Sequence, residues 1–418
     1  MFEWRKNKMK KINKLKKLLI LIIIILVSFT SKINAKELSL ISEKYIMYNL
    51  NDNKVILKKN ENDKTQIASL TKIMTVLVAV ENIEDYNTKI VITKDMIKDI
   101  KWDVAKIGLK EGQTVTYDDL LYCTMLPSAA DCANGLAISI AGNYDKYVEM
   151  MNNKAASLKL QNTRFANPVG LYDEKNYSTA SDVAKMLNYA LKSKKFKQIF
   201  EMKEYTMSTG KKIKSTLMTY NKKVSEDISY ITGAKTGYIK LAGNCLASTA
   251  TINGVNYMLV TLNAYSTQKS PHILDATTAY KYFYENFSYK TILNKNDVIV
   301  TLNAKNSKEK RISIHHDKEY KYYLGNDFKK ENVTYEYDGI KEVSYFTKKG
   351  TILGKVKIKY NNETLKEFTL YFNETLHFSL LSFLCPNIIY IILIVLFLII
   401  ILSIFKKSKG KRKNNKRR

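Results

Sequence analysis

Cysteine is scarce in this 418-residue chain, and its four cysteines show no C-x-x-C spacing. They are Cys123, Cys132, Cys245 and Cys385. Residues 117–141 read as one helix, on which Cys123 and Cys132, nine positions apart, would point in opposite directions. We therefore expect neither a disulfide framework nor a zinc site, and the sequence implies no metal or other cofactor.

Histidine is equally scarce, with four residues that all lie in the last 150 positions. They are His272, His315, His316 and His377. The adjacent pair would face opposite sides of a strand, which is a poor arrangement for chelating a metal. A nucleophile early in the chain has no histidine within 200 residues in sequence to serve as its base.

Acidic residues are few beside the basic ones: 39 Asp and Glu face 68 Lys and Arg, giving a net charge of +29. Residues 1–36 and 406–418 together hold 19 of the basic residues and one acid, so the rest of the chain is only +11. The charge is concentrated where membrane topology needs it and suits an anionic wall or lipid surface. Nucleic acid is therefore not an expected partner.

The N-terminus, residues 1–35, is predicted to be a signal peptide. A basic segment from Lys6 to Lys17 precedes a ten-residue apolar run, Leu18 to Val27. Ile33-Asn34-Ala35 offers a weak cleavage site. The alternative is an uncleaved signal-anchor.

The C-terminus carries a second apolar run, residues 388–405, followed by the basic tail 406–418. Eighteen helical residues span about 27 Å, close to the thickness of the bilayer hydrocarbon. A buried core helix is the alternative, but nine basic residues follow directly and fit a stop-transfer tail on the cytoplasmic side. We expect a single C-terminal span in the cell membrane, with residues 36–387 extracytoplasmic.

Residues 36–288 are predicted to form an α+β domain with helices against an antiparallel sheet. The domain begins with two β-prone runs around the turn Asn51-Asp52-Asn53. Residues 67–81 are predicted to form a helix that is apolar on nearly every side. Further helices are expected at 117–141, 143–159, 180–191 and 273–287, and strands between 224 and 266. An all-round apolar helix is predicted to lie at the centre of its domain.

Residues 291–376 have a different character, rich in Lys, Asn, Tyr, Val and Ile with short alternating runs. Val356 to Tyr360 is one such run, and Asn361-Asn362 offers a turn before the next. We predict a small all-β domain without a catalytic constellation, acting as a spacer or recognition module.

Ser69-Leu70-Thr71-Lys72 opens the apolar helix and is the first chemical motif. The pattern S-x-x-K alone is weak evidence, because it also begins at Ser208, Ser266, Ser307, Ser403 and Ser408. Only Ser69 starts an apolar helix, where the i, i+3 spacing places it on one face with Lys72. A buried lysine loses proton affinity and can serve as a base. The alternative is a capping serine beside a snorkelling lysine.

Two further motifs are weak alone. Lys235-Thr236-Gly237 lies in a β-prone stretch. The lysine charge and the threonine hydroxyl can hold a carboxylate, and the glycine lets a substrate approach the strand closely. The alternative is a simple turn at the end of a strand. Ser128, in Pro127-Ser128-Ala129-Ala130, could be an ordinary helix N-cap.

Together these motifs match in order the S-x-x-K, S-x-N and K-T-G set of penicillin-recognising enzymes. The chain resembles low-molecular-weight penicillin-binding proteins that are serine D-alanyl-D-alanine carboxypeptidases. The resemblance rests on residues 67–75, 233–238 and 242–246, and on the segments Asn167-Pro168-Val169-Gly170-Leu171 and Tyr177-Ser178-Thr179-Ala180. It covers residues 38–285 well and 291–376 loosely. It implies a penicillin-binding/β-lactamase-like transpeptidase domain, then an all-β domain and the membrane helix.

The resemblance implies catalytic roles for three residues. Ser69 would be the nucleophile, Lys72 its general base, and Ser128 a relay that carries a proton to the leaving amine. The substrates would be peptidoglycan stem peptides ending in D-Ala-D-Ala, and β-lactam antibiotics would be inhibitors.

The resemblance also implies a substrate-binding set on the later motif: Lys235, Thr236, Gly237 and Tyr238. The first two would bind the terminal carboxylate of the substrate. The backbone N–H groups of Ser69 and Tyr238 would form the oxyanion hole.

Two positions depart from the family pattern. Ala130 stands where the second motif normally ends in asparagine, and His272 aligns with an arginine that often helps to hold the carboxylate. Two other functions therefore stay open: a non-catalytic wall-binding or penicillin-binding protein, and a β-lactamase. The latter needs a deacylating glutamate, for which the sequence offers only Asp173-Glu174.

Overall fold

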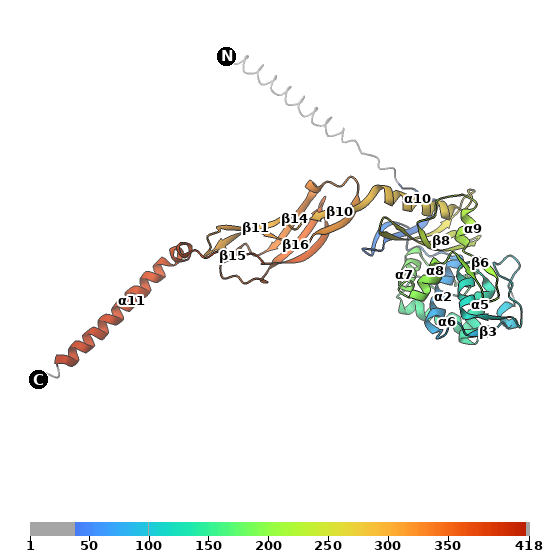
Figure 1. Ribbon diagram of the computed structural model, residues 1–418, viewed down its shortest axis with the longest axis horizontal. Helices are drawn as coiled ribbons and strands as arrows, with labels where there is room; N and C mark the ends of the chain where they lie inside the picture. The colour runs from blue at the N-terminus through green and yellow to red at the C-terminus, as the bar shows by residue number, and fades with distance from the viewer. Residues whose placement is uncertain (1–37, 99, 415–418) are drawn as a thin grey trace, which may run out of the picture. The chain divides into compact units, whose positions relative to one another are not determined.

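The computed structural model describes residues 38–98 and 100–414, so the predicted signal peptide at residues 1–35 lies outside the described residues. The chain divides into two compact units between Tyr284 and Glu285. Figure 1 shows the first as an α+β unit and the second as a β-rich unit that continues into a long helix.

A five-stranded antiparallel sheet organises the first unit, with strand order β2-β1-β9-β8-β7. The strands are β1 (Lys44–Asn49), β2 (Lys54–Lys59), β7 (Ile231–Ile239), β8 (Gly243–Ile252) and β9 (Val255–Ala264). The predicted turn at Asn51-Asp52-Asn53 joins β1 to β2, and β1 pairs with β9 across more than 200 residues of sequence. Strand β7 is at the edge of the sheet, so it has a strand neighbour on one side only.

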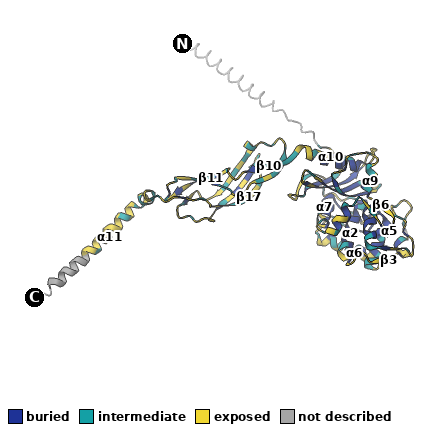
Figure 2. Cartoon of the chain, viewed as in Figure 1, coloured by how far each residue is buried: buried dark blue, intermediate teal, exposed yellow. Residues whose placement is uncertain are grey.

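Helix α2 (Thr71–Asn82) lies at the centre of the helical block, and its residues from Thr71 to Ala79 are all buried. The helices around it are α4 (Tyr117–Met125), α5 (Ala130–Ala141), α6 (Tyr144–Ser157), α7 (Ala180–Ala190) and α8 (Lys194–Glu201). Figure 2 shows the buried residues gathered inside this block. The central position expected from the apolar sequence of this helix is confirmed.

Helix α10 (Pro271–Asn286) covers the other face of the sheet. On β8, Ala247 belongs to the core that the sheet shares with the helical block, whereas the next residue, Ser248, hydrogen-bonds the Tyr280 hydroxyl of α10 at 2.9 Å. Successive side chains of a strand point to opposite faces, so helices cover both sides of the sheet. The predicted α+β class is confirmed.

The expectation that no disulfide forms between Cys123 and Cys132 is wrong. The structure joins them by a disulfide with the two Cα atoms 6.0 Å apart. The helix expected over 117–141 is two helices, α4 and α5, separated by Leu126 to Ala129. Because the chain turns there, the two sulfur atoms face each other, and the 180° separation on one continuous helix does not apply.

Short elements that the sequence analysis did not anticipate complete the first unit. They are η1 (Ala68–Leu70), β3 (Lys89–Val91), α3 (Lys94–Ile97), β4 (Thr114–Thr116), β5 (Glu204–Thr206), β6 (Lys212–Lys214) and α9 (Thr216–Asn221). Strands β3 and β4 pair with each other, as do β5 and β6.

The second unit is built from short strands around its own core of Ile, Leu and Val side chains. Its strands are β10 (Phe287–Leu293), β11 (Val298–Lys305), β12 (Arg311–His315), β13 (Tyr320–Gly325), β14 (Val333–Gly339), β15 (Glu342–Ser344), β16 (Ile352–Tyr360) and β17 (Glu363–Tyr371), with one 3-10 turn, η2 (Lys330–Asn332). The predicted turn at Asn361-Asn362 joins β16 to β17. The expected all-β fold is confirmed.

Helix α11 (Leu380–Asn414) ends the described chain. Its stretch Leu380–Ser403 is long and apolar enough to cross a membrane, and none of that stretch is buried within the protein. Figure 2 shows its exposed surface. A core helix would be mostly buried, so this exposure argues against the core-helix alternative.

Candidate active site

The first two predicted residues lie together where η1 leads into α2. Lys72 Nζ donates hydrogen bonds to Ser69 Oγ at 3.1 Å and to the Val169 carbonyl oxygen at 2.6 Å. Ala68, just before the serine, has a positive φ of 46°, which is uncommon for a residue other than glycine. The strained turn therefore presents the serine hydroxyl directly to a buried amine.

Burial sets the proton affinity of this lysine. The Lys72 side chain is almost completely buried, and desolvation lowers its pKa from 10.5 to about 7, although the Asp131 carboxylate partly opposes the shift. A neutral amine can accept the serine proton, so the pair has the arrangement of a nucleophile and its base.

Ser128 lies at the corner between α4 and α5, but it is not the N-cap that its sequence allowed. Ala129 occupies the N-cap position of α5, and Ser128 itself has a left-handed φ of 65°. The Ser128 hydroxyl oxygen is buried and has no hydrogen-bond partner. A buried, unpaired hydroxyl at a strained residue is costly unless a ligand or proton transfer uses it.

Strand β7 supplies the other wall of the site. Thr236, on this edge strand, donates its hydroxyl to Thr216 Oγ1 of α9 at 2.7 Å. A Cβ atom added to Gly237 would lie 3.0 Å from the backbone nitrogen of Ser69, so glycine allows β7 to lie directly against the turn that holds the serine. The next side chain, Tyr238, is exposed at the rim.

One cavity of about 580 Å³ brings most of the predicted residues together. Its lining includes Ser69, Lys72, Ser128, Thr236, Gly237 and Tyr238. Lys235 differs, because its side chain is fully buried beside the cavity and its Nζ donates to the Thr236 carbonyl oxygen at 2.8 Å. Burial and the neighbouring Lys72 lower the pKa of Lys235 well below its ordinary value.

Several lining residues were missed by the sequence analysis, including Thr216, Tyr220 and Lys240. None belongs to a motif, and the fold alone brings α9 to the edge of the sheet. Val169 was singled out only within a segment that carries the family resemblance, yet its carbonyl oxygen accepts a hydrogen bond from Lys72. The glycine after it, Gly170, was the available sequence signal for a close backbone contact. The structure shows why glycine is needed there: its φ is 85°, and a Cβ would lie 2.0 Å from the Ala68 carbonyl oxygen.

His272 does not reach the cavity. It is completely buried on α10, where it packs edge-on against Tyr220 with ring centroids 4.7 Å apart. Neither ring nitrogen has a hydrogen-bond partner, and burial lowers the pKa of the imidazole to about 3. A neutral ring behind Tyr220 does not provide the positive charge of the arginine with which it aligns.

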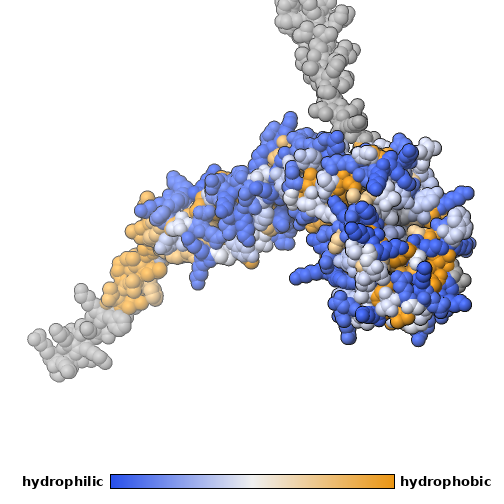
Figure 3. Space-filling model, turned by 45° about the vertical axis from the view of Figure 1, so that its right-hand side comes forward, coloured by the Kyte–Doolittle hydropathy of each residue, from blue (hydrophilic) through white to orange (hydrophobic). Residues whose placement is uncertain are grey.

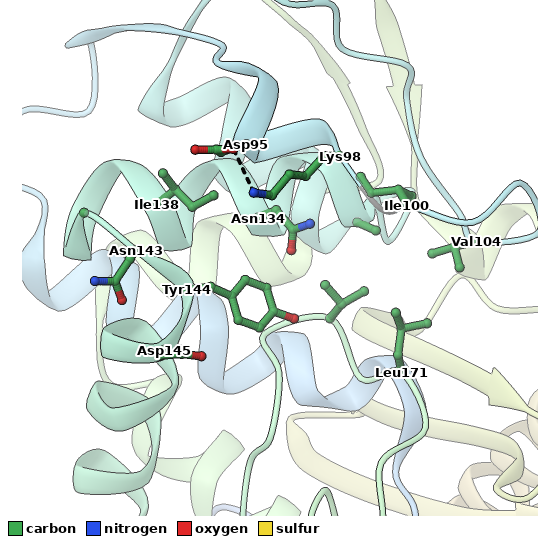
Figure 4. A pocket seen from close by; sticks show the side chains of 13 residues that line it. Asp95, Lys98, Ile100, Val104, Asn134, Ile138, Asn143, Tyr144, Asp145 and Leu171 are labelled. Atoms are coloured by element: carbon green, nitrogen blue, oxygen red, sulfur yellow. Dashed lines mark ion pairs between the residues drawn. The ribbon is translucent and has the colours of Figure 1, made fainter.

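Ala130 lines a second cavity of about 440 Å³, which shares Val104, Val169 and Leu171 with the first. Figure 4 shows Asn134 and Tyr144 reaching into it. Ala130 is buried against Val169, so no side chain extends from its position toward Lys72. Ala130 therefore supplies no hydrogen-bonding group at the position where the resembled family has asparagine.

Asp131 has a structural role at the start of α5. Its buried carboxylate accepts backbone N–H groups from Ile107, Gly108 and Leu109 at 2.8 to 3.2 Å. These bonds fix the loop after α3 against the start of α5. Within residues 38–98 and 100–414, no group of three His, Cys, Asp or Glu side chains could hold a metal ion.

The fold and the Ser69–Lys72 pair define a class of protein, the serine enzymes of the penicillin-binding type. Two family models match the chain: D-alanyl-D-alanine carboxypeptidase over residues 31–266, and the C-terminal domain of penicillin-binding protein 5 over residues 287–377. The chain belongs to the D-alanyl-D-alanine carboxypeptidase family, as its motifs suggested.

Individual relatives agree with this assignment. The chain is 28% identical over 232 residues to D-alanyl-D-alanine carboxypeptidase DacF of Bacillus subtilis, covering 54% of this chain and 59% of that protein. It is 30% identical over 247 residues to a D-alanyl-D-alanine endopeptidase of Escherichia coli, covering 58% and 77%. Penicillin-binding protein 5 of Haemophilus influenzae has the same fold, with a TM-score of 0.61 at 21% identity over 81% of this chain and 98% of that one.

The depressed pKa of Lys72 predicts how acylation depends on pH. The lysine must be neutral to accept the serine proton, so the rate should rise with pH through about 7 and then level off. Below that value it should fall about tenfold per pH unit, which makes acylation at pH 5 about a hundredfold slower than at pH 8. The second-order rate of fluorescent penicillin labelling measures this, with circular dichroism as a control for folding. A flat profile would rule out this pKa.

A second prediction concerns Ala130. Replacing it with asparagine should place an amide beside Lys72 and raise the penicillin acylation rate about tenfold, the effect of one hydrogen bond of roughly 1.4 kcal/mol. Ala130→Leu is the matched control, because leucine has the shape of asparagine without its hydrogen-bonding groups and should give no gain. If Ala130→Asn slows labelling while the melting temperature is unchanged, the pocket is built around alanine.

Proposed function

We propose that this protein is a serine D-alanyl-D-alanine carboxypeptidase that removes the terminal D-Ala from peptidoglycan stem peptides and is inhibited by β-lactams. The observation that carries the proposal is the 3.1 Å contact between Ser69 Oγ and a buried Lys72 amine whose pKa is lowered to about 7. Membership of the D-alanyl-D-alanine carboxypeptidase family supports the reaction and its substrate.

The proposed reaction uses these groups in turn. Lys72 takes the proton of Ser69, and the serine oxygen attacks the carbonyl carbon between the two D-Ala residues. The N–H groups of Ser69 and Tyr238 stabilise the oxyanion. As the C–N bond breaks, the unpaired Ser128 hydroxyl relays the proton to the departing amine. Water then adds to the ester with Lys72 again as base. Lys72 passes this proton to the Ser69 oxygen as the ester bond breaks and the shortened peptide is released.

The terminal carboxylate of the substrate lies against Thr236 in this proposal. The threonine hydroxyl lines the cavity, while Lys235 is buried directly behind it. An approaching carboxylate favours the charged form of a lysine, so binding restores the proton that burial disfavours on Lys235. Lys240, which is exposed in the cavity wall, supplies a further positive charge at the rim.

The two alternatives have weaker support. A decayed, non-catalytic site does not explain why the serine, the buried amine and the strained turn are all in place. A β-lactamase needs a glutamate that activates the deacylating water, but Glu174 is exposed and lines neither of the two cavities described above.

Fluorescent penicillin and a D-Ala-D-Ala peptide together test the function. The protein should form a lasting penicillin adduct and release D-Ala from the peptide, and Ser69→Ala should lose both activities while keeping its fold, as checked by circular dichroism. Rapid clearance of the adduct would indicate a β-lactamase instead. Labelling of Ser69→Ala would remove this residue as the nucleophile, and labelling without D-Ala release would contradict the carboxypeptidase activity.

Membrane anchoring is the second part of the proposal. We infer that α11 crosses the cell membrane once, with both folded units outside and the basic tail inside. The apolar stretch Leu380–Ser403 is followed by nine Lys and Arg residues within positions 406–418, which favours a cytoplasmic tail.

Protease added to intact cells tests this topology. It should digest the folded units and spare an epitope tag placed after Arg418, because the bilayer shields the cytoplasmic side. A tag on the extracytoplasmic side of a known membrane protein serves as the control for protease activity. Digestion of the tag after Arg418 would overturn the topology.

A further inference from the structure

Four aromatic side chains gather where the β-rich unit meets α11, and we call them the aromatic tip: Tyr345, Phe346, Phe378 and Phe383. Tyr345 and Phe346 follow β15, Phe378 precedes α11, and Phe383 lies in its first turn. Phe346 and Phe378 each contact Phe383, with ring centroids 6.3 and 5.9 Å apart. The tip therefore joins two separate segments of the β-rich unit to the helix.

The tip is a structured part of the domain. Tyr345 N donates to the Lys305 carbonyl, and the turn after it is closed by hydrogen bonds in both directions between Ser344 and Thr347. Phe378 forms an isolated β-bridge with Ser307. The backbone on both sides is thus fixed to β11 and the loop that follows it.

These rings nevertheless face outward. Phe346 is 60% exposed and Tyr345 is 42% exposed, and Leu381 beside them at the start of α11 is 73% exposed. Figure 3 shows hydrophobic surface where α11 joins the β-rich unit. A patch of large apolar side chains held rigidly in water indicates a surface that is covered in the functional state.

The length of α11 indicates what covers this apolar surface. About 20 helical residues cross the roughly 30 Å of bilayer hydrocarbon, and counting back from Phe405, before the basic tail, reaches Pro386. Phe383 then lies about 4.5 Å outside the hydrocarbon, within a headgroup layer about 5–7 Å thick. Tilting of the helix would bring it closer to the hydrocarbon. The rings that contact Phe383 are therefore at the depth where aromatic side chains concentrate in membrane proteins.

We propose that the aromatic tip inserts into the outer headgroup layer of the membrane that α11 crosses, so that the β-rich unit contacts lipid directly. Lys348 and Lys349, exposed two and three residues after Phe346, then face the phosphates of anionic lipids. This inference rests on the proposed anchoring by α11. It adds a second membrane contact, made by the folded domain itself.

Tryptophan fluorescence in the full-length chain, reconstituted at one chain per lipid nanodisc, tests this contact. The two native tryptophans, Trp4 and Trp102, are replaced by phenylalanine, and a single probe is introduced by Phe346→Trp. The matched control is Glu363→Trp in the same domain. Glu363 begins β17, and eight strand steps of about 3.3 Å place it about 26 Å from Tyr371. The residue after Tyr371, Phe372, accepts a hydrogen bond from Gly350, which follows Phe346 by four positions. Tyr390→Trp within α11 reports insertion of the helix.

With nitroxide-labelled headgroups, the probe at position 346 should be quenched severalfold more than the probe at 363, and its emission should be blue-shifted. Lipids brominated in the acyl chain should quench the probe at position 390 strongly if α11 crosses the membrane. If they do, but headgroup quenching is equally weak at 346 and 363, the contact between the aromatic tip and lipid is overturned while the anchoring by α11 stands. No quenching at 390 would overturn the anchor and the tip with it. A blue shift at 346 that needs two chains per disc and comes without lipid quenching would show that a second copy covers the rings, which also overturns the proposal.

Discussion

The site depends on keeping one amine out of water. Lys72 can act as a base because burial removes the solvation that would keep it charged, and the Val169 carbonyl, 97 residues away in sequence, holds it toward Ser69. That approach requires Gly170, since any Cβ there would collide with the Ala68 backbone. A loop far from Ser69 in sequence therefore helps to hold the Lys72 amine in position.

The other walls of the site follow from the same close packing. Ser128 is held in a left-handed conformation at a helix corner, and Gly237 lets the edge strand lie against the backbone of Ser69. Three parts of the chain that are distant in sequence thus meet around one cavity. The strained backbone and the unpaired hydroxyl of Ser128 both cost free energy, and the packing of the surrounding core offsets that cost.

The second unit differs from the first in where its apolar side chains lie. The sheet of the first unit hides its apolar side chains between layers of helices, whereas α11 exposes them along its whole apolar stretch. Where that helix begins, the aromatic tip continues the exposed apolar surface onto the folded domain. The backbone of the tip is fixed by hydrogen bonds, so the start of the helix is held by the domain and is not a free linker.

The sequence by itself determined the buried central helix, the antiparallel strands, the all-β unit, the apolar C-terminal helix and the three motifs, because each depends on local periodicity or spacing. Only the tertiary structure decided the rest. Cys123 and Cys132 meet because the chain turns between two helices, and His272 is neutral because a tyrosine and the core enclose it. Thr216 and Tyr220 enter the cavity through the placement of α9. Lys235, which was expected to bind the carboxylate of the substrate, is buried and is not among the residues that line the cavity. Such features arise from contacts between residues far apart in sequence, and desolvation, which sets the proton affinity of both lysines, exists only once those contacts have formed.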